Sequence, residues 1–335
     1  MTLLLAFIPP PPFRTLEIGP LNLRMYGLSI ALGVLAAVWI AQKRWEARGH
    51  DPAEIASLAM WAVPAGILGA RAYHVATDSQ LFKGRWEHAF YIWEGGLGIP
   101  GGVAAGVLAG YIYARVKKLS VPELFDTAAP ALPVAQAIGR MGNYFNQELF
   151  GRPSDLPWAL EVDPSARPDG YAQFETFQPT FLYELLWNLA LAAVIVFVVE
   201  RFVKLRPGRL FAIYVGGYGL GRLWVESLRI DPANEPGGFR VNVWMSILLI
   251  VGSALFLLRD HFRPAPPAPK PDTDTDESPS DDAADKADPD EDDANDSDVD
   301  AEAATDGTDE ADADADADEA AASADDDADA AVETT

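Results

Sequence analysis

An all-α integral membrane protein is predicted here: a seven-transmembrane-helix bundle with a small extracytoplasmic cap and a disordered acidic C-terminal tail. Three observations lead to this fold class, namely long apolar segments, basic residues that alternate between the connections, and an abrupt change of composition near Lys270. A helix needs about 20 apolar residues to cross roughly 30 Å of hydrocarbon. A backbone in lipid must also satisfy its own hydrogen bonds, which favours helices.

Seven apolar segments approach the length of a membrane span. They cover residues 21–41, 55–75, 95–114, 124–138, 179–202, 210–228 and 241–258. The fourth is short and interrupted by prolines, so it departs furthest from a typical span. We therefore predict an extracytoplasmic N-terminal segment over residues 1–20 and a seven-helix membrane domain over residues 21–263.

Basic residues in the connections predict the orientation of these spans. Clusters of Lys and Arg follow the first, third, fifth and seventh segments, for example at Lys43, Arg115, Arg201 and Arg259. Cytoplasmic loops are enriched in Lys and Arg, so we expect the N-terminus outside and the C-terminal tail in the cytoplasm. The longest connection, about residues 140–178, then forms the outer cap, in which "WALEV" and "AQFETF" predict short strands.

The C-terminal region differs sharply from the rest of the chain. Residues 271–335 hold 29 of the 50 acidic residues and one basic residue, Lys286. Because it has no aromatic residue, this region cannot bury enough apolar surface to offset the entropy of ordering. We interpret residues 264–335 as a Pro-rich linker and a disordered tail. We expect this tail to be solvated; the alternatives are that it senses ions or binds a basic partner.

The composition also excludes several kinds of chemistry. The chain has no cysteine, so it forms no disulfide and cannot use a thiol of its own in catalysis. It shows neither metal-ligand spacing nor a phosphate-binding glycine loop. We expect no metal, no cofactor and no nucleic acid partner.

Charges within the apolar segments are the main functional signal. A charge at the centre of a spanning helix costs about 2.5–3.5 kcal/mol, so it persists if it is paired or if it binds an anion. Arg71, Arg140 and Arg222 lie in such segments or at their outward ends, and Tyr218, Arg222 and Glu226 share one helical face. Arg222 could pair with Glu226 and only hold the bundle together. Alternatively, these arginines bind phosphate as bidentate forks, and a phospholipid headgroup supplies phosphate at that depth.

The most specific motif is "GRMGNYFNQELFG", residues 139–151. It resembles the signature of bacterial prolipoprotein diacylglyceryl transferases, a Gly-Arg-x-Gly-Asn-aromatic-x-Asn-x-Glu-x-x-Gly pattern. The resemblance continues in chain order through "MYGLSIALG", "GARAYHV", "IWEGGLGI", "QPTFLYELLWNL" and "YGLGRLWVESLR". It covers roughly residues 20–260, so only the tail is unmatched.

This resemblance implies a reaction in the bacterial inner membrane. The diacylglyceryl group of phosphatidylglycerol passes to the lipobox cysteine thiol in the signal peptide of a prolipoprotein, and glycerol phosphate leaves. The implied partners are phosphatidylglycerol, these signal peptides and the lipid bilayer. We expect catalytic roles for Arg140, Arg222, Tyr26, Tyr218 and Glu148. We expect phosphatidylglycerol contacts from Arg140, Asn143, Asn146, Gly151, Arg222, Glu226 and Arg71.

Two departures from the family pattern concern the proton acceptor. Many relatives have histidines where this chain has Pro100 and Gln178, so a histidine base is absent from both positions. A free cysteine has a pKa of about 8.5, so the incoming thiol is only partly ionised at neutral pH. Either the two arginines lower the pKa of the thiol, or a tyrosine or the lipid phosphate accepts its proton.

Two other functions are compatible with these residues: a lipid or anion transporter, and a non-catalytic homologue that handles lipids or lipoproteins. The chain lacks the matching broken helices in two halves that are typical of transporters. It also retains the arginines and asparagines that an inactive homologue would be expected to lose. Both observations favour the transferase.

Overall fold

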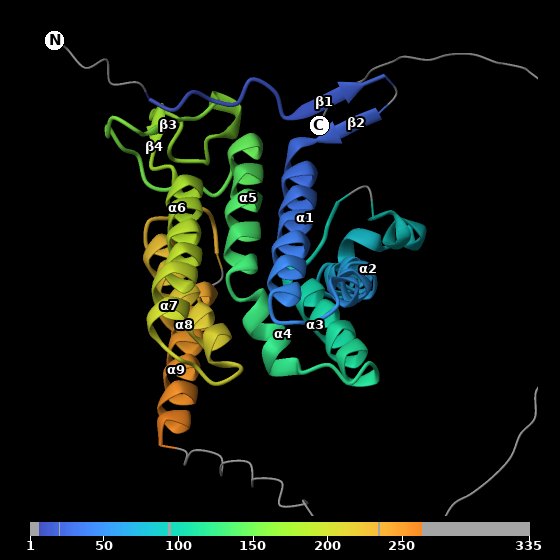
Figure 1. The fold of residues 1–335 in the computed structure, drawn as a ribbon. Coiled ribbons are helices and arrows are strands. Elements are labelled where there is room, and N and C mark those ends of the chain that lie inside the picture. Colours follow the sequence, from blue (N-terminus) through green and yellow to red (C-terminus); the bar gives the residue numbers. More distant parts are fainter. Residues whose placement is uncertain (1–6, 20, 93–94, 234, 263–335) are drawn as a thin grey trace, which may run out of the picture. The chain divides into compact units, whose positions relative to one another are not determined.

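The computed structural model describes residues 7–19, 21–92, 95–233 and 235–262, and most of these residues are helical (Figure 1). The predicted linker and tail, residues 264–335, lie outside the described residues, as do residues 1–6. The long helices are α1 (Met25–Glu46), α2 (Pro52–Thr77), α3 (Ile99–Val116), α5 (Ala131–Asn146), α6 (Thr180–Ala193), α8 (Arg209–Glu226) and α9 (Val241–His261).

Five helical segments of the described chain are long and apolar enough to cross a membrane. They are Met25–Glu46, Pro52–Thr77, Ile99–Val116, Thr180–Phe202 and Val241–Arg259. The segment Thr180–Phe202 runs from α6 through the π-helical turns of η5 (Val194–Val199) into α7 (Glu200–Phe202). The protein is therefore an all-α integral membrane protein.

The sixth predicted span forms a helix that falls outside this set. This helix, α8, carries three charged residues, Arg209, Arg222 and Glu226. Because α8 is 18 residues long, a crossing would include all three charges, whereas each of the five spans contains an 18-residue stretch with at most 2 charged residues.

The fourth predicted span is two helices, α4 (Val121–Ala128) and α5 (Ala131–Asn146), separated at Ala129 and Pro130. A proline lacks the N–H that a continuous helix would need there. The helix α5 extends beyond the predicted end at residue 138, so the prediction that the connection starts at Arg140 is wrong. The reason is tertiary packing: the extension of α5 packs against the start of α1, where a Cβ at Gly142 would lie 2.8 Å from Cδ2 of Tyr26.

The first helix begins later than its apolar run. Leu21–Arg24 forms strand β2, which pairs antiparallel with β1 (Thr15–Ile18), and α1 starts at Met25. The strands "TLEI" and "LNLR" flank a turn in which Gly19 has φ +58°, a conformation that glycine adopts readily. A helix from residue 21 was therefore the wrong expectation.

The two strands predicted in the long connection are confirmed as β3 (Leu160–Glu161) and β4 (Thr176–Phe177), which pair antiparallel. Leu160 and Phe177 of these strands belong to a small apolar core that also contains Phe150, Val162 and Phe181. Ile8 of the N-terminal segment forms a bridge with Leu160. These contacts fix the connection above the start of α6.

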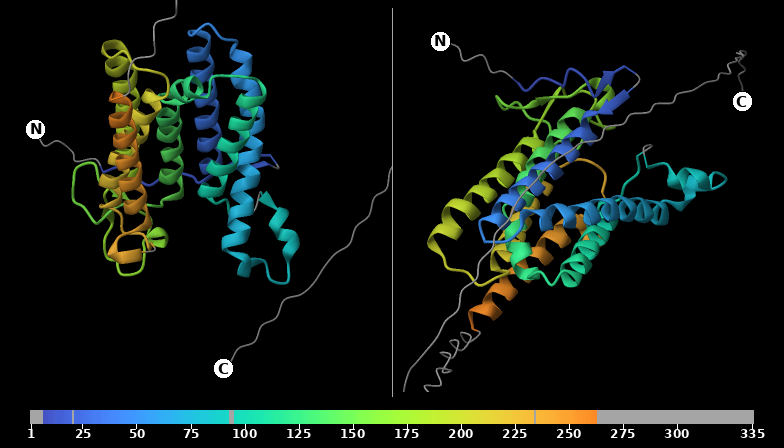
Figure 2. Two further views of the ribbon diagram at one scale, coloured as in Figure 1. Left: turned by 90° about the horizontal axis from the view of Figure 1, so that it is seen from below. Right: turned by 45° about the vertical axis from the view of Figure 1, so that its right-hand side comes forward.

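The helices pack in two groups: the pair α2–α3, and a group that contains α5, α6, α8 and α9. The pair α2–α3 packs through glycines, whose small size lets two helices approach closely, with the Cα of Gly66 3.7 Å from a Cβ built at Gly106. Figure 2 shows this pair extending away from α6 and α9. In the other group, α6 contacts both α5 and α8, and α8 contacts α9. This places α6 between the motif helix α5 and the arginine-bearing helix α8.

Candidate functional site

Arg140 on α5 and Arg222 on α8 meet at one carboxylate, that of Glu184 on α6. The Nη2 atom of Arg140 lies 2.5 Å from Glu184 Oε2, and the Nη1 atom of Arg222 lies 2.9 Å from Glu184 Oε1. Only 7% of the Glu184 side chain is exposed, against 20% for Arg140 and 12% for Arg222. A carboxylate this deeply buried needs charged partners, and here one arginine binds each of its oxygens.

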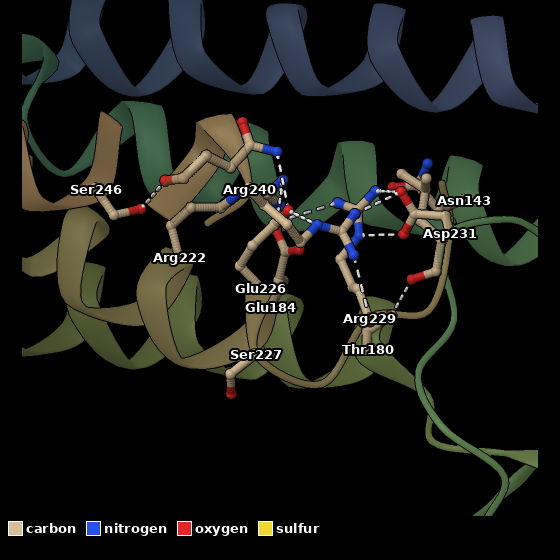
Figure 3. Close-up of polar contacts among 12 residues, drawn as sticks. Asn143, Thr180, Glu184, Arg222, Glu226, Ser227, Arg229, Asp231, Arg240 and Ser246 are labelled. Atoms are coloured by element: carbon tan, nitrogen blue, oxygen red, sulfur yellow. Dashed lines mark hydrogen bonds and ion pairs between the residues drawn. The ribbon is translucent and has the colours of Figure 1, made fainter. Parts of the chain in front are cut away.

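A second carboxylate, Glu226, gathers three arginines around it (Figure 3). Its oxygens lie 2.8 Å from Arg222 Nη2, 2.7 Å from Arg240 Nε and 3.7 Å from Arg229 Nη1. Asn242 donates a further hydrogen bond of 3.2 Å to Oε1. The side chain of Glu226 is fully buried, and its carboxylate holds the terminal nitrogen of Arg222 that does not bind Glu184.

Asp231 extends this network into the connection between α8 and α9. Arg229 Nε donates to it at 2.7 Å and Arg240 Nη2 at 2.8 Å. Partial burial by itself would raise the pKa of Asp231, but the hydrogen bonds and charges of the two arginines outweigh burial and hold that pKa below its usual value. Asp231 is therefore ionised at neutral pH and fixes the connection against the helix ends.

The signature segment forms a hydrogen-bonded chain of its own. Arg140 Nη1 donates to Asn143 Oδ1 at 3.2 Å, and Asn143 Nδ2 donates to Glu148 Oε1 at 2.7 Å. Gln147 ends α5 in the left-handed conformation with φ 52°, which turns the chain so that Glu148 comes back towards Asn143. Asn146, the last residue of α5, lies one turn beyond Gly142.

The last glycine of the signature, Gly151, lies where three backbone segments meet. Its N–H donates to the carbonyl of Gln178 at 2.9 Å, and it forms a bridge with Arg229. A Cβ at this position would lie 3.0 Å from the carbonyl oxygen of Leu228. The lack of a side chain lets the connection after α5 approach the end of α8.

The two predicted tyrosines occupy different sides of this region. Tyr26, at the start of α1, lies against Gly142 of α5. Tyr218 lies one turn before Arg222 on α8 and packs beside Tyr214, with 6.3 Å between the ring centroids. Of the predicted residues, Arg140, Asn143, Glu148, Arg222 and Glu226 thus belong to one connected set of polar contacts, and the tyrosines flank it.

Arg71 belongs to a different environment. Its guanidinium donates to backbone carbonyls of the segment after α2: those of His88, Ala89, Gly95 and Gly96. It lines a separate cavity of about 380 Å³ together with His74 and Arg85. The structure therefore does not bring Arg71 into the set around Arg140 and Arg222.

Sequence reasoning missed Glu184, Asp231 and Arg240 as members of the network. Glu184 was detectable, because it is an acidic residue within the apolar segment "QPTFLYELLWNL", and intramembrane charges mark functional sites. Asp231 and Arg240 follow the helix end in a polar connection, where charges are ordinary. Only their contacts with Arg229 and Glu226 distinguish them.

These features define the class of protein. It is an integral membrane protein in which α5, α6, α8 and α9 surround a buried arginine–carboxylate network. Comparison with protein families matches residues 14–259 to the prolipoprotein diacylglyceryl transferase family.

Curated relatives agree with this match. The chain is 46% identical over 264 residues to phosphatidylglycerol–prolipoprotein diacylglyceryl transferase 2 of Streptomyces coelicolor, covering 78% of this chain and 83% of the relative. It is 47% identical over 254 residues to the transferase of Cutibacterium acnes, covering 75% and 86%. For the transferase of Frankia alni the identity is 48% over 266 residues, covering 78% and 69%. The chain belongs to the prolipoprotein diacylglyceryl transferase family.

Proposed function

We propose that this protein transfers the diacylglyceryl group of phosphatidylglycerol to the lipobox cysteine thiol of prolipoproteins. The observation that carries the proposal is the convergence of Arg140 and Arg222, from two helices, on a single acidic group. The names of the relatives supply the two substrates. They give no support to the transporter or to the non-catalytic homologue.

Arg140 and Arg222 bind the phosphate of the lipid headgroup. A guanidinium has five N–H donors, and the contacts with Glu184, Asn143 and Glu226 use the two terminal nitrogens of each arginine. Each arginine therefore keeps donors for a further oxygen ligand. Both side chains are also partly exposed, whereas the Glu226 carboxylate is enclosed and acts through Arg222 rather than on the lipid.

The reaction is a substitution at a glycerol carbon. The cysteine sulfur forms a bond to the carbon of the diacylglyceryl unit that carries the phosphate. The bond from that carbon to the phosphate oxygen breaks, and glycerol phosphate departs. The thiol proton is released to the leaving phosphate or to water. Negative charge grows on the departing phosphate oxygen, and Arg140 and Arg222 stabilise this charge in surroundings of low dielectric constant.

The remaining signature residues support these arginines. Asn143 receives a hydrogen bond from Arg140 and donates one to Glu148, which restricts the Arg140 side chain. Asn146 and Gly151 follow on the same segment and shape the approach of the headgroup. Tyr26 and Tyr218 flank the cluster and contribute hydroxyl groups to the lipid or the thiol.

Seven crossings of the bacterial inner membrane complete the proposal. The α4–α5 segment and α8 cross with the five apolar spans, so the N-terminus and the β3–β4 cap lie outside and the tail lies in the cytoplasm. The alternation of basic connections supports this orientation. Because the chain has no cysteine, single cysteines test it directly. A membrane-impermeant maleimide should label Ser154→Cys in intact spheroplasts and Lys118→Cys only after lysis; the reverse pattern would contradict the orientation.

The function is tested by measuring transfer of labelled diacylglyceryl from phosphatidylglycerol to a lipobox peptide, with glycerol phosphate release followed in parallel. Wild-type protein should produce both products in equal amounts, and folded Arg140→Ala should lose both. Arg44→Ala is the matched control. It removes an arginine that is paired with Glu200 in the last turn of α1, whereas Tyr26 at the start of α1 lies beside the proposed site. Absence of transfer by folded, lipid-binding wild type would refute the proposal.

A further inference from the structure

We infer that Glu184 is a positioning residue, which sets the separation of the Arg140 and Arg222 guanidinium groups so that one phosphate can bind both. The inference rests on the proposed function and deepens it. Glu184 is absent from the set of residues expected from the sequence, and its role follows from its place between two helices.

Glu184 links α5 and α8 through charged contacts with both helices. The helix α6 contacts both α5 and α8, and the Glu184 side chain reaches one arginine on each. Two guanidinium groups close together in a medium of low dielectric constant repel each other strongly. Without an acidic group between them, Arg140 and Arg222 would move apart or take other partners.

The geometry of the carboxylate resembles that of the proposed ligand. Arg140 binds Oε2 of Glu184 and Arg222 binds Oε1, so each arginine binds one oxygen of a shared acidic group. A phosphodiester likewise carries two unesterified oxygens on one atom. Arginines that are held at this separation can each offer a remaining N–H to one oxygen of the headgroup.

The backbone that carries Glu184 is itself fixed. One turn earlier, the Thr180 hydroxyl donates to the carbonyl of Leu149, which belongs to the signature segment. One turn later, Asn188 is 2% exposed. The carboxylate is therefore anchored on a buried stretch of α6, and it can impose its position on the two arginines rather than follow them.

Glu184→Gln tests the role, because it keeps the shape and removes the charge. Glu200→Gln is the matched control: Glu200 lies 16 residues later in the same helical segment, and it binds Arg44 as Glu184 binds Arg222. Folding of each variant is checked by thermal unfolding in detergent. The rate of transfer is measured at varied concentrations of phosphatidylglycerol, at varied concentrations of the lipobox peptide and at varied pH.

For folded Glu184→Gln we expect kcat to fall about a hundredfold, the scale that misplaced catalytic groups produce. The KM for phosphatidylglycerol should rise while the KM for the peptide stays at its wild-type value. The shape of the pH profile should not change. Glu184→Asp keeps the charge but withdraws it by one methylene, and it should recover part of the lost kcat.

Wild-type kcat and KM in folded Glu184→Gln would overturn the inference. Loss of the acidic limb of its pH profile would also overturn it, because Glu184 would then be a proton acceptor. If the Gln variant does not fold, Glu184→Asp decides: full activity in this folded variant would refute the positioning role. Failure of wild type to transfer would instead refute the proposed function, so the two failures are distinguishable.

Discussion

Tyr26 on α1 lies directly against Gly142 on α5: a Cβ built at position 142 would stand 2.8 Å from Cδ2 of the tyrosine ring. Gly142 is two residues after Arg140, so this contact fixes the tyrosine beside the signature. The close approach also explains why a glycine occupies this position of the motif. A methyl group there must displace the ring or separate the two helices.

Gly142→Ala should therefore lower both stability and activity. Overpacking a buried contact costs about 1–3 kcal/mol, which thermal unfolding in detergent would register as a lower Tm. Transfer should fall with it, because Tyr26 moves. Gly139→Ala is the control on the same helix, since a Cβ there has no atom within 4 Å; its Tm should be unchanged or higher. Equal effects of the two substitutions would contradict a specific contact with Tyr26.

Arg222→Lys tests whether the fork geometry of the arginine matters. Arg222 binds Glu184 and Glu226 through different terminal nitrogens, and a lysine has one nitrogen for both. We expect kcat/KM for phosphatidylglycerol to fall about a hundredfold. Arg44→Lys alters a two-contact pair with Glu200 elsewhere in the chain and should leave kcat/KM near wild type. Full activity in folded Arg222→Lys would show that charge alone is sufficient.

Arg71→Lys distinguishes a structural role from lipid binding. Arg71 is 6% exposed and its guanidinium bonds to backbone carbonyls of the α2–α3 connection. A lysine can keep only some of these bonds, so we expect a lower Tm and faster proteolysis within residues 78–98. The control is Arg85→Lys, which alters an exposed arginine whose Nε donates to the carbonyl of Leu81 at 3.4 Å. An unchanged Tm with a raised KM for phosphatidylglycerol would support lipid binding by Arg71 instead.

Deletion of the chain after Lys270 should leave transfer intact. The family match ends at residue 259, and the proposed site lies between Tyr26 and Asn242. The deletion removes 29 acidic residues, so the truncated protein should differ mainly in its net charge. The specific activity of folded, truncated protein measures this, and a large fall would assign the tail a part in catalysis.

Local pattern predicted much of the secondary structure, and it failed where packing overrode it. Apolar runs located the helices because each segment in lipid must satisfy the hydrogen bonds of its own backbone. The end of α5 was wrong because the run of apolar residues stops at Ile138, whereas the helix continues to Asn146 and packs Gly142 against Tyr26 of α1. The start of α1 was wrong because Leu21–Arg24 finds a strand partner in Thr15–Ile18.

The site shows the same division. Residue order and type within residues 139–151 were enough to indicate the family and to select Arg140, Asn143 and Glu148, because a motif is a local property of the chain. The partnership of Arg140 with Arg222 through Glu184 spans α5, α6 and α8. No local pattern contains that contact. It arises when helix packing brings two positive charges close together in a dry interior, where an acidic group between them becomes necessary.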